Sequence, residues 1–320
     1  MPRLALPFAL LVLFALAATA LAASHATRIQ SKNGQDALRP FGAGGYVGFQ
    51  ENSVAHRNHY DVFLRAPSGQ TIQVNRPGTT GEAGGIEGNT VIYSEGSHAG
   101  TTLTLYDIAT GQYTPLPVTG KPAAGLHPTV SGPWVLYWGE TASHRSTVQL
   151  YNIQTGENRI LGTGPARDGY VYPGQVNGDH AVWGNVLHYG KRRQTDALFL
   201  TQISTGKTTA LKRPRGELYE YTPAVTPQGT VFFTRQRPCS GRGCQSRVHN
   251  TQRAVNQIMV QPLGGKQRVL LTLPHGDDTG SLFAAPAPGG GTTLFFGRYP
   301  WLRNGKFYGY SSLFQVHGPA

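Results

Sequence analysis

Short stretches in which apolar and polar residues alternate recur along the chain, and each ends at a glycine. The clearest is Leu-Tyr-Asp-Ile-Ala-Thr-Gly at residues 105–111, which returns as Leu-Tyr-Asn-Ile-Gln-Thr-Gly at 150–156 and as Leu-Thr-Gln-Ile-Ser-Thr-Gly at 200–206. Fainter copies begin at Leu64 and Val260. Tyr, Ile and Thr suit a half-buried pleated strand, and the closing glycine supplies the positive φ of a tight turn. Each copy therefore predicts a strand that runs into a hairpin.

A second pattern precedes each copy of the first. It is a proline or small residue, an apolar pair, a turn that contains glycine, and then an alternating strand rich in Val, Tyr, Phe and Trp. Instances begin at Gly85, His127, Tyr172, Thr222 and Ala285. The two patterns together make a unit of four strands, and successive copies of the first start 41 to 60 residues apart. A period of that length, built from several short strands, is typical of a propeller or a solenoid.

The sequence thus predicts an all-β protein, a six-bladed β-propeller of four-stranded antiparallel blades. The six blades are centred on residues 36–74, 83–116, 126–161, 170–211, 219–273 and 281–316. The last blade shows only three convincing strands. We expect Ala26 to Ser31 to supply the fourth, because pairing of the first and last strands would close the ring and hide edges that template aggregation.

The fifth predicted blade carries a family resemblance. Its residues 221–233, Tyr-Thr-Pro-Ala-Val-Thr-Pro-Gln-Gly-Thr-Val-Phe-Phe, together with the Leu-Tyr-Asp-Ile-Ala-Thr-Gly pattern, resemble the repeat of TolB-type six-bladed propellers. That repeat reads roughly Pro-x-Trp-Ser-Pro-Asp-Gly, a strand, then Leu-Tyr-x-x-x-x-Gly, and here Thr226 and Gln228 replace its Ser and Asp. The resemblance implies a propeller and export. It does not imply the translocation role of the full TolB protein, because no counterpart of that protein's N-terminal α/β domain is found.

The first 22 residues have a different composition from the rest of the chain. Arg3 is followed by an apolar core and by Ala20-Leu21-Ala22, the small-residue pattern that signal peptidase cleaves. We expect residues 1–22 to be a signal peptide, residues 23–320 to form the propeller domain, and the mature protein to be periplasmic or extracellular. A retained membrane anchor is the alternative, although the apolar run is short for a bilayer span.

The chain is strongly basic, with a formal net charge of +12 at pH 7. Much of this charge falls between the second and third strands of predicted blades four to six, in loops that leave a propeller on one face. The predicted binding residues are Lys191, Arg192, Arg193, Arg235, Arg237, Arg242, Arg247, Arg253, Arg298, Trp301 and Arg303. They indicate a contact surface for a protein partner or for a polyanion such as an acidic glycan, an anionic lipid or nucleic acid. The alternative is a set of solvated charged loops.

Two cysteines, Cys239 and Cys244, lie within this basic stretch. Two thiolates cannot complete a structural zinc site, and their spacing is not that of a Cys-x-x-Cys redox motif. In an oxidising compartment we expect a disulfide that staples the loop, with two free thiols as the alternative.

Motifs for catalysis are mostly absent. We find no Gly-x-Ser-x-Gly, no His-Glu-x-x-His and no phosphate-binding glycine loop. Acidic residues do precede several innermost strands, and oxygen ligands of this kind could hold calcium. They are Glu82, Asp168, Glu220, Asp277 and Asp278. His127 and His275 occupy similar places, and we expect them to be structural.

The leading functional hypothesis is therefore an exported, non-enzymatic binding scaffold without a cofactor, whose contact surface is the basic loop face of blades four to six. The alternative is a calcium-dependent hydrolase or lyase that acts in the central channel.

Overall fold

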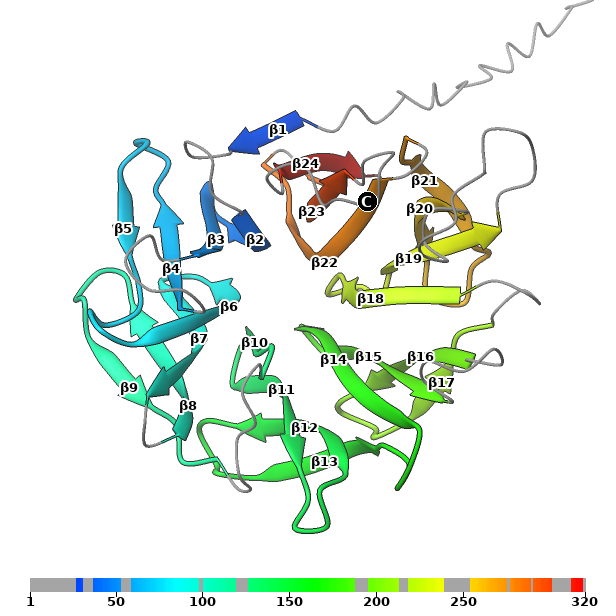
Figure 1. Ribbon diagram of the computed structural model, residues 1–320, viewed down its shortest axis with the longest axis horizontal. Helices are drawn as coiled ribbons and strands as arrows, with labels where there is room; N and C mark the ends of the chain where they lie inside the picture. Colours follow the sequence, from blue (N-terminus) through cyan, green and yellow to red (C-terminus); the bar gives the residue numbers. More distant parts are fainter. Residues whose placement is uncertain are drawn as a thin grey trace, which may run out of the picture.

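The computed structural model describes residues 27–30, 37–52, 59–97, 100–118, 126–187, 195–212, 218–238, 254–274, 277–288, 290–300 and 312–318. The regular structure in these ranges consists of β-strands, which pair antiparallel into six four-stranded sheets. Figure 1 shows the sheets arranged around a central space, with one strand of each sheet facing it. The expected all-β propeller of four-stranded antiparallel blades is confirmed.

Sheets 1 to 3 each follow the chain outward from the centre. Sheet 1 consists of β2 (Ala37–Ala43), β3 (Tyr46–Asn52), β4 (Tyr60–Arg65) and β5 (Thr71–Gln73). Sheet 2 consists of β6 (Thr80–Glu87), β7 (Thr90–Ser97), β8 (Gly100–Asp107) and β9 (Tyr113–Pro115). Sheet 3 consists of β10 (Thr129–Ser131), β11 (Trp134–Glu140), β12 (Ser146–Asn152) and β13 (Asn158–Thr163).

Sheets 4 and 5 repeat this order, and sheet 6 departs from it. Sheet 4 consists of β14 (Gly169–Asn177), β15 (His180–Leu187), β16 (Thr195–Gln202) and β17 (Thr208–Ala210). Sheet 5 consists of β18 (Leu218–Val225), β19 (Val231–Pro238), β20 (Ala254–Gln261) and β21 (Arg268–Thr272). Sheet 6 consists of β22 (Asp277–Pro286), β23 (Thr292–Pro300), β24 (Ser312–Gly318) and the N-terminal β1 (Thr27–Gln30).

The strand predicted at Ala26 to Ser31 is β1, and it pairs antiparallel with β24. Thr27 lies opposite Gln315, and Arg28 lies opposite Phe314. Figure 1 shows β1 at the outer edge of sheet 6, next to β24. Sheet 6 therefore combines strands from the two ends of the described chain.

The repeated Leu-Tyr-Asp-Ile-Ala-Thr-Gly pattern folds as a strand followed by a hairpin. In sheet 2 the Asp107 carboxylate accepts a hydrogen bond of 2.7 Å from the backbone N–H of Thr110, and Gly111 has a φ of 70°. Gly156 and Gly206, the glycines that close the other two copies, have φ values of 74° and 68°. A side chain is strained at such angles, so glycine is the residue that this turn needs.

The inner strands share a second feature, a break in their pairing with the neighbouring strand. The register shifts between Leu38 and Phe41, Ala83 and Gly85, Pro173 and Val176, Glu220 and Ala224, and Thr279 and Leu282. In sheet 3, β10 begins at Thr129, at the corresponding point. Such bulges turn side chains out of the ladder. They therefore present side chains to the centre of the molecule.

Sheets 1 and 6 pack together through an aromatic seam. The Phe41 and Phe283 rings meet edge to face with centroids 6.3 Å apart, and Phe283 meets Phe295 at 6.5 Å. A Cβ on Gly42 would lie 2.5 Å from the Phe295 ring, so the seam requires glycine there. All three aromatic residues are buried. Sheets 1 and 6 are thus direct neighbours with a shared core.

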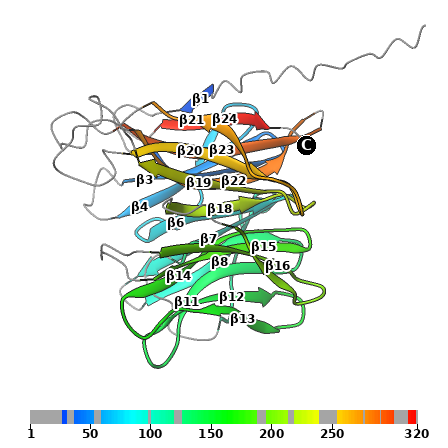
Figure 2. The same cartoon turned by 90° about the vertical axis from the view of Figure 1, so that its right-hand side faces the viewer.

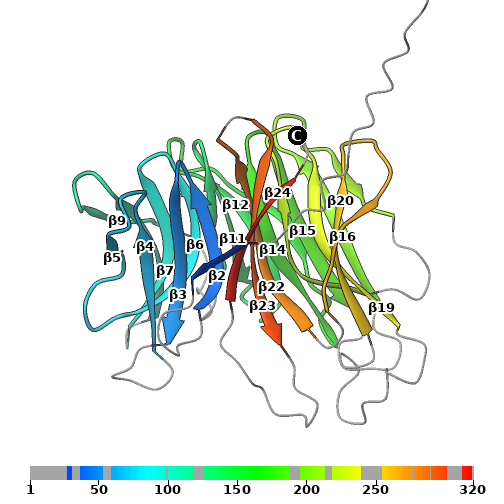
Figure 3. The same cartoon turned by 90° about the horizontal axis from the view of Figure 1, so that it is seen from above.

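The strands run between two faces of the molecule, as Figure 2 shows from the side. We use the name loop face for the face at which the second strand of each sheet ends and the third strand begins. The arrowheads of β3, β19 and β23 point to this face in Figure 3. No helix within the described ranges is long and apolar enough to cross a membrane. Residues 1–26, which include the predicted signal peptide, lie outside those ranges.

Candidate functional site

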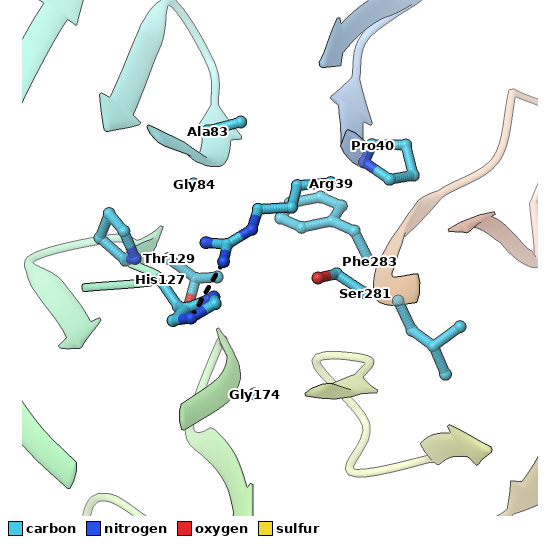
Figure 4. Close-up of a pocket in the computed structure, with 11 residues that line it drawn as sticks. Arg39, Pro40, Ala83, Gly84, His127, Thr129, Gly174, Ser281 and Phe283 are labelled. Atoms are coloured by element: carbon cyan, nitrogen blue, oxygen red, sulfur yellow. Dashed lines mark hydrogen bonds between the residues drawn. The ribbon is translucent and has the colours of Figure 1, made fainter. Parts of the chain in front are cut away.

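A small pocket lies at the centre of the molecule, between the inner strands (Figure 4). Its polar lining comes from Arg39, His127, Thr129 and Ser281, and its walls are completed by proline, alanine, glycine, leucine and phenylalanine side chains. The space amounts to about 320 Å³ with its open mouth included. Much of this volume is open solvent at the mouth, so only a small group can be enclosed by the walls.

Three charged or titratable side chains meet at this pocket, from sheet 1, from sheet 2 and from the segment that leads into sheet 3. Arg39 Nη1 forms an ion pair with Glu82 Oε1, and Arg39 Nη2 lies 3.1 Å from His127 Nε2. His127 Nε2 is 3.9 Å from the same Glu82 oxygen. The other Glu82 oxygen accepts a hydrogen bond of 3.2 Å from the Ser94 hydroxyl. We call Arg39, Glu82 and His127 the central cluster.

The protonation state of His127 follows from this arrangement. A guanidinium donates hydrogen bonds and cannot accept them, so His127 Nε2 must accept from Arg39 and the ring proton must be on Nδ1. Burial, and secondarily the positive charge of Arg39, hold the pKa of His127 well below its usual value of 6.5. At neutral pH the central cluster therefore consists of one cation, one anion and one neutral imidazole.

The backbone is strained at two of the three cluster residues. Arg39 has a φ of 50° and His127 a φ of 45°, which non-glycine residues rarely adopt. Each is followed by a proline, Pro40 or Pro128, which further limits the backbone conformations of the preceding residue. Strain of this kind costs about 1–3 kcal/mol per residue and is found most often where a side chain must be held in place for a function.

The opposite part of the centre is closed by an uncharged network around Gln175 of β14. Its Oε1 accepts from Ala284 N at 2.9 Å and from Val225 N at 3.3 Å, and its Nε2 donates to Ala284 O at 2.7 Å. Asn177 Nδ2 donates to Val225 O at 3.0 Å. The Gln175 side chain is only 2% exposed. This network, which we call the Gln175 clamp, joins the inner strands of sheets 4, 5 and 6.

The central cluster lies in the half of the channel nearer the loop face. Because β2 is antiparallel to β3, which ends at the loop face, β2 begins there, and Arg39 is its third residue. The same reasoning places the start of β22 at the loop face, and Ser281 is its fifth residue. Arg39 thus lies toward the face at which β19 and β23 end, where two of the predicted basic segments begin.

Two of the predicted binding residues have described side chains, and both make contacts within their own sheet. Arg298 forms an ion pair with Asp277. Burial raises the pKa of Asp277 above its ordinary value, although the charge of Arg298 opposes this shift. Arg235 Nη2 donates to Gln257 Oε1 at 2.9 Å. These contacts place both arginines near the ends of β19 and β23, at the base of the predicted surface.

The other predicted binding residues are not described at the level of side chains. Arg237 lies in β19, where only its backbone is described. Lys191, Arg192, Arg193, Arg242, Arg247, Arg253, Trp301 and Arg303 lie outside the described residues, as do Cys239 and Cys244. The basic contact surface and the disulfide therefore stay predictions.

The acidic residues considered for calcium do not come together in the described part of the chain. Glu82 pairs with Arg39, and Asp277 pairs with Arg298. The side chains of Glu220 and Asp278 lie outside the description. Within its limits, no three His, Cys, Asp or Glu side chains form a group able to hold a metal ion. Asp168 stands at the start of sheet 4 with a φ of 57°.

The sequence patterns did not identify Arg39, Gln175 or Ser281, which the structure brings to the centre. The sequence did contain a signal for Arg39. Like His127, Arg39 is followed by a proline, and it lies within the register shift of its strand. No comparable local signal distinguishes Gln175, since its partners lie in two other sheets.

No family model and no curated protein matches the chain. Solved structures do match, and they are TolB-like β-propellers. The structure of a putative TolB from Agrobacterium tumefaciens has a TM-score of 0.57 at 12% identity, over 83% of this chain and 91% of that one. TolB from Acinetobacter baumannii has a TM-score of 0.53 at 11% identity, over 86% of this chain and 64% of that one.

The propeller domain of the Trilobed protease from Pyrococcus furiosus is also similar. It has a TM-score of 0.52 at 10% identity, over 89% of this chain and 96% of that one. At such low identities the likeness shows a common fold and nothing about activity. The chain is thus a β-propeller of the kind found in TolB and in protease propeller domains.

Proposed function

We propose that the protein is an exported, non-enzymatic binding scaffold whose contact surface is the loop face of sheets 4 to 6. One observation carries the proposal. The strands β15, β19 and β23 all end at the loop face, and each is followed in the sequence by an arginine- and lysine-rich segment, residues 188–194, 239–253 and 301–311.

The base of this face is tied together by buried hydrogen bonds between sheets 5 and 6. The hydroxyls of Thr234 and Thr279 are 2.8 Å apart across sheets 5 and 6, and Asn256 Nδ2 donates to Asp277 O at 2.8 Å. All four residues are buried. Surface segments anchored on such a base lose less conformational freedom when they bind, which favours recognition. The partner is a protein or a polyanion that complements positive charge.

A salt titration tests the proposal. The mature protein is applied to heparin, to anionic vesicles and to single-stranded DNA at low and moderate salt. Retention on at least one of them should fall steeply as salt rises, because condensed counterions are released on contact. The double variant Arg242→Ala and Arg247→Ala should bind more weakly and with a smaller salt dependence.

The control variant carries the same change in charge on the opposite face. Lys207 and Lys266 are exposed and lie in the hairpins that follow β16 and β20, so Lys207→Ala with Lys266→Ala should bind like the unaltered protein. Equal losses in the two double variants would mean that net charge alone explains retention. Stoichiometric calcium in the purified protein would instead support the alternative of a hydrolase or lyase acting in the channel.

We further propose that the six sheets form one closed ring, sealed by the pairing of β1 with β24. The aromatic seam between Phe41, Phe283 and Phe295 supports this proposal, because it already holds sheets 1 and 6 in contact. In such a ring β1 covers the edge of β24, which would otherwise be open to pairing with another chain.

A further inference from the structure

We propose that the central pocket is a binding site for an organic carboxylate, with Arg39 as its anchor. This site is separate from the basic loop face and does not depend on it. The pocket combines the Arg39 guanidinium, the hydroxyl side chains of Thr129 and Ser281 and apolar walls in a partly open space.

Arg39 is held in a defined orientation before any ligand arrives. Glu82 fixes one end of the guanidinium and His127 the other, and the Glu82 carboxylate is itself restrained by Ser94. The side chain of Arg39 is 23% exposed and lines the pocket. A planar guanidinium fixed in this way matches the planar, two-oxygen geometry of a carboxylate. The strained backbone at Arg39 and His127 is consistent with side chains held in place for recognition.

The wall opposite Arg39 adds a hydrogen-bonding group. The register shift in β22 removes Ser281 from the ladder. In Figure 4 the hydroxyl of Ser281 faces the space between itself and the Arg39 guanidinium. A carboxylate in that space would lie between a cation and a hydroxyl donor, and a Ser hydroxyl can rotate to suit it.

The charge and the walls of the pocket favour a monocarboxylate over other anions. Glu82 stands beside Arg39 and repels any anion in the pocket. This repulsion is stronger for an anion with two charges, such as phosphate, than for an anion with one. Pro40, Pro128 and Phe283 provide apolar contact for a hydrocarbon stem. The ligand class is therefore a carboxylate on a short apolar group, either a free small acid or the C-terminal end of a peptide that enters from the loop face.

Calorimetric titration of the mature protein tests the proposal with two pairs of probes. Butyrate is compared with butyramide, and a tripeptide ending in leucine with a free carboxylate is compared with its C-terminal amide. The proposal expects butyrate or the acid peptide to bind, and its neutral counterpart to bind at least about tenfold more weakly, since a site built for a charged group rejects its uncharged analogue. Tighter binding of the peptide would identify a chain terminus as the source, and binding of butyrate alone would identify a small acid.

Three variants complete the experiment. Arg39→Lys should weaken binding about tenfold or more, because an ammonium cannot pair with both carboxylate oxygens in the same plane. Arg159→Lys, at an arginine that stacks on Trp134 away from the pocket, should have no effect. Ser281→Leu fills the pocket and should abolish binding. If Arg39→Lys does not fold, this second variant tests whether the pocket is the binding site.

Two results would overturn the proposal. One is equal binding, or none, for the acid and amide members of both pairs. The other is unchanged binding in a folded Arg39→Lys or Ser281→Leu variant. The loop-face double variant at Arg242 and Arg247 should bind these small probes normally, so failure of the scaffold proposal and failure of this one are distinguishable.

Discussion

The two halves of the propeller centre are built from the same repeat but are held together by different chemistry. In sheets 1 to 3 the inner strands meet through the charged and titratable side chains of Arg39, Glu82 and His127. In sheets 4 to 6 they meet through the neutral side chain of Gln175, which hydrogen-bonds the backbone of Val225 and Ala284. The charged half borders a pocket, and the neutral half is closed.

The proposed carboxylate site and the stabilising network thus lie in different halves of one channel. A neutral amide that satisfies three buried backbone groups is a stabilising element, because each of those groups would be costly to leave unpaired. A partly exposed ion pair contributes little to stability, and the strained backbone beneath it has a cost. We therefore expect changes in the Gln175 clamp to affect folding, and changes in the central cluster to affect mainly binding and pH response.

The largest effect is expected for Gln175→Ala. The substitution leaves the N–H groups of Val225 and Ala284 and the carbonyl of Ala284 without their partner in a buried position. We expect the free energy of unfolding to fall by about 3–5 kcal/mol. Chemical denaturation followed by circular dichroism measures the change. Gln112→Ala, at an exposed glutamine, is the matched control and should be nearly neutral. A loss of less than about 1 kcal/mol, the size of a single ordinary hydrogen bond, would show that the clamp is not a stabilising element.

A smaller effect is expected at the rim of the molecule, where deletion of residues 27–30 removes β1. The deletion exposes the edge of β24 and breaks its backbone pairing with β1. We expect the free energy of unfolding to fall by about 2 kcal/mol, because only a few hydrogen bonds are lost and each makes a modest net contribution to stability. The melting temperature should drop by about 3–4 °C for a domain of this size, and aggregation on heating should increase. An unchanged melting temperature would contradict the proposal that β1 seals the ring. It would mean that the contacts that stabilise the fold lie at the centre of the molecule.

The smallest effect concerns the pH dependence of stability in the charged half. Since the pKa of His127 is lowered in the folded protein, the unfolded chain takes up the proton first as the pH falls below 6.5. The stability linked to His127 is thus fully present above this pH and is lost progressively as the pH falls toward the lower, folded-state pKa. Arg39 opposes protonation, whereas Glu82 at 3.9 Å would favour it.

His127→Asn tests this linkage without changing the backbone preference, because asparagine tolerates the left-handed conformation. The fall in melting temperature between pH 7 and pH 5 should be smaller in this variant than in the unaltered protein. His144→Asn is the matched control, since His144 has a φ of 59° and an 80% exposed ring. Identical pH profiles for His127→Asn and the unaltered protein would mean that His127 does not titrate differently in the folded state.

The blades could be predicted from the sequence because their signals are local. Alternating side chains define each strand, and the glycine that closes each hairpin, such as Gly111, is required by a backbone angle within a few residues of the strand. The N-terminal strand at residues 27–30 was also predictable, since the last repeat lacked a fourth strand.

The centre could not be predicted in the same way, because its contacts join positions far apart in the chain. Gln175 and Ala284 are brought together by the arrangement of whole sheets and by bulges in two inner strands. Glu82 was expected to precede an inner strand, but it lies within β6, and its partner is Arg39 rather than another carboxylate. Which side chains meet depends on how each bulge turns them, and a bulge has no clear signature in alternating polarity.

The pairing of β1 with β24 also constrains the order in which the molecule can fold. Thr27 and Gln315 stand near opposite ends of the sequence, so sheet 6 cannot be completed until almost the whole chain is present. Closing so long a loop costs little more entropy than closing one of half its length, but contacts between distant positions form slowly. The other five sheets are each made from consecutive strands and need no such wait. Sheet 6 therefore needs the C-terminal strand to reach an N-terminal segment that was made first.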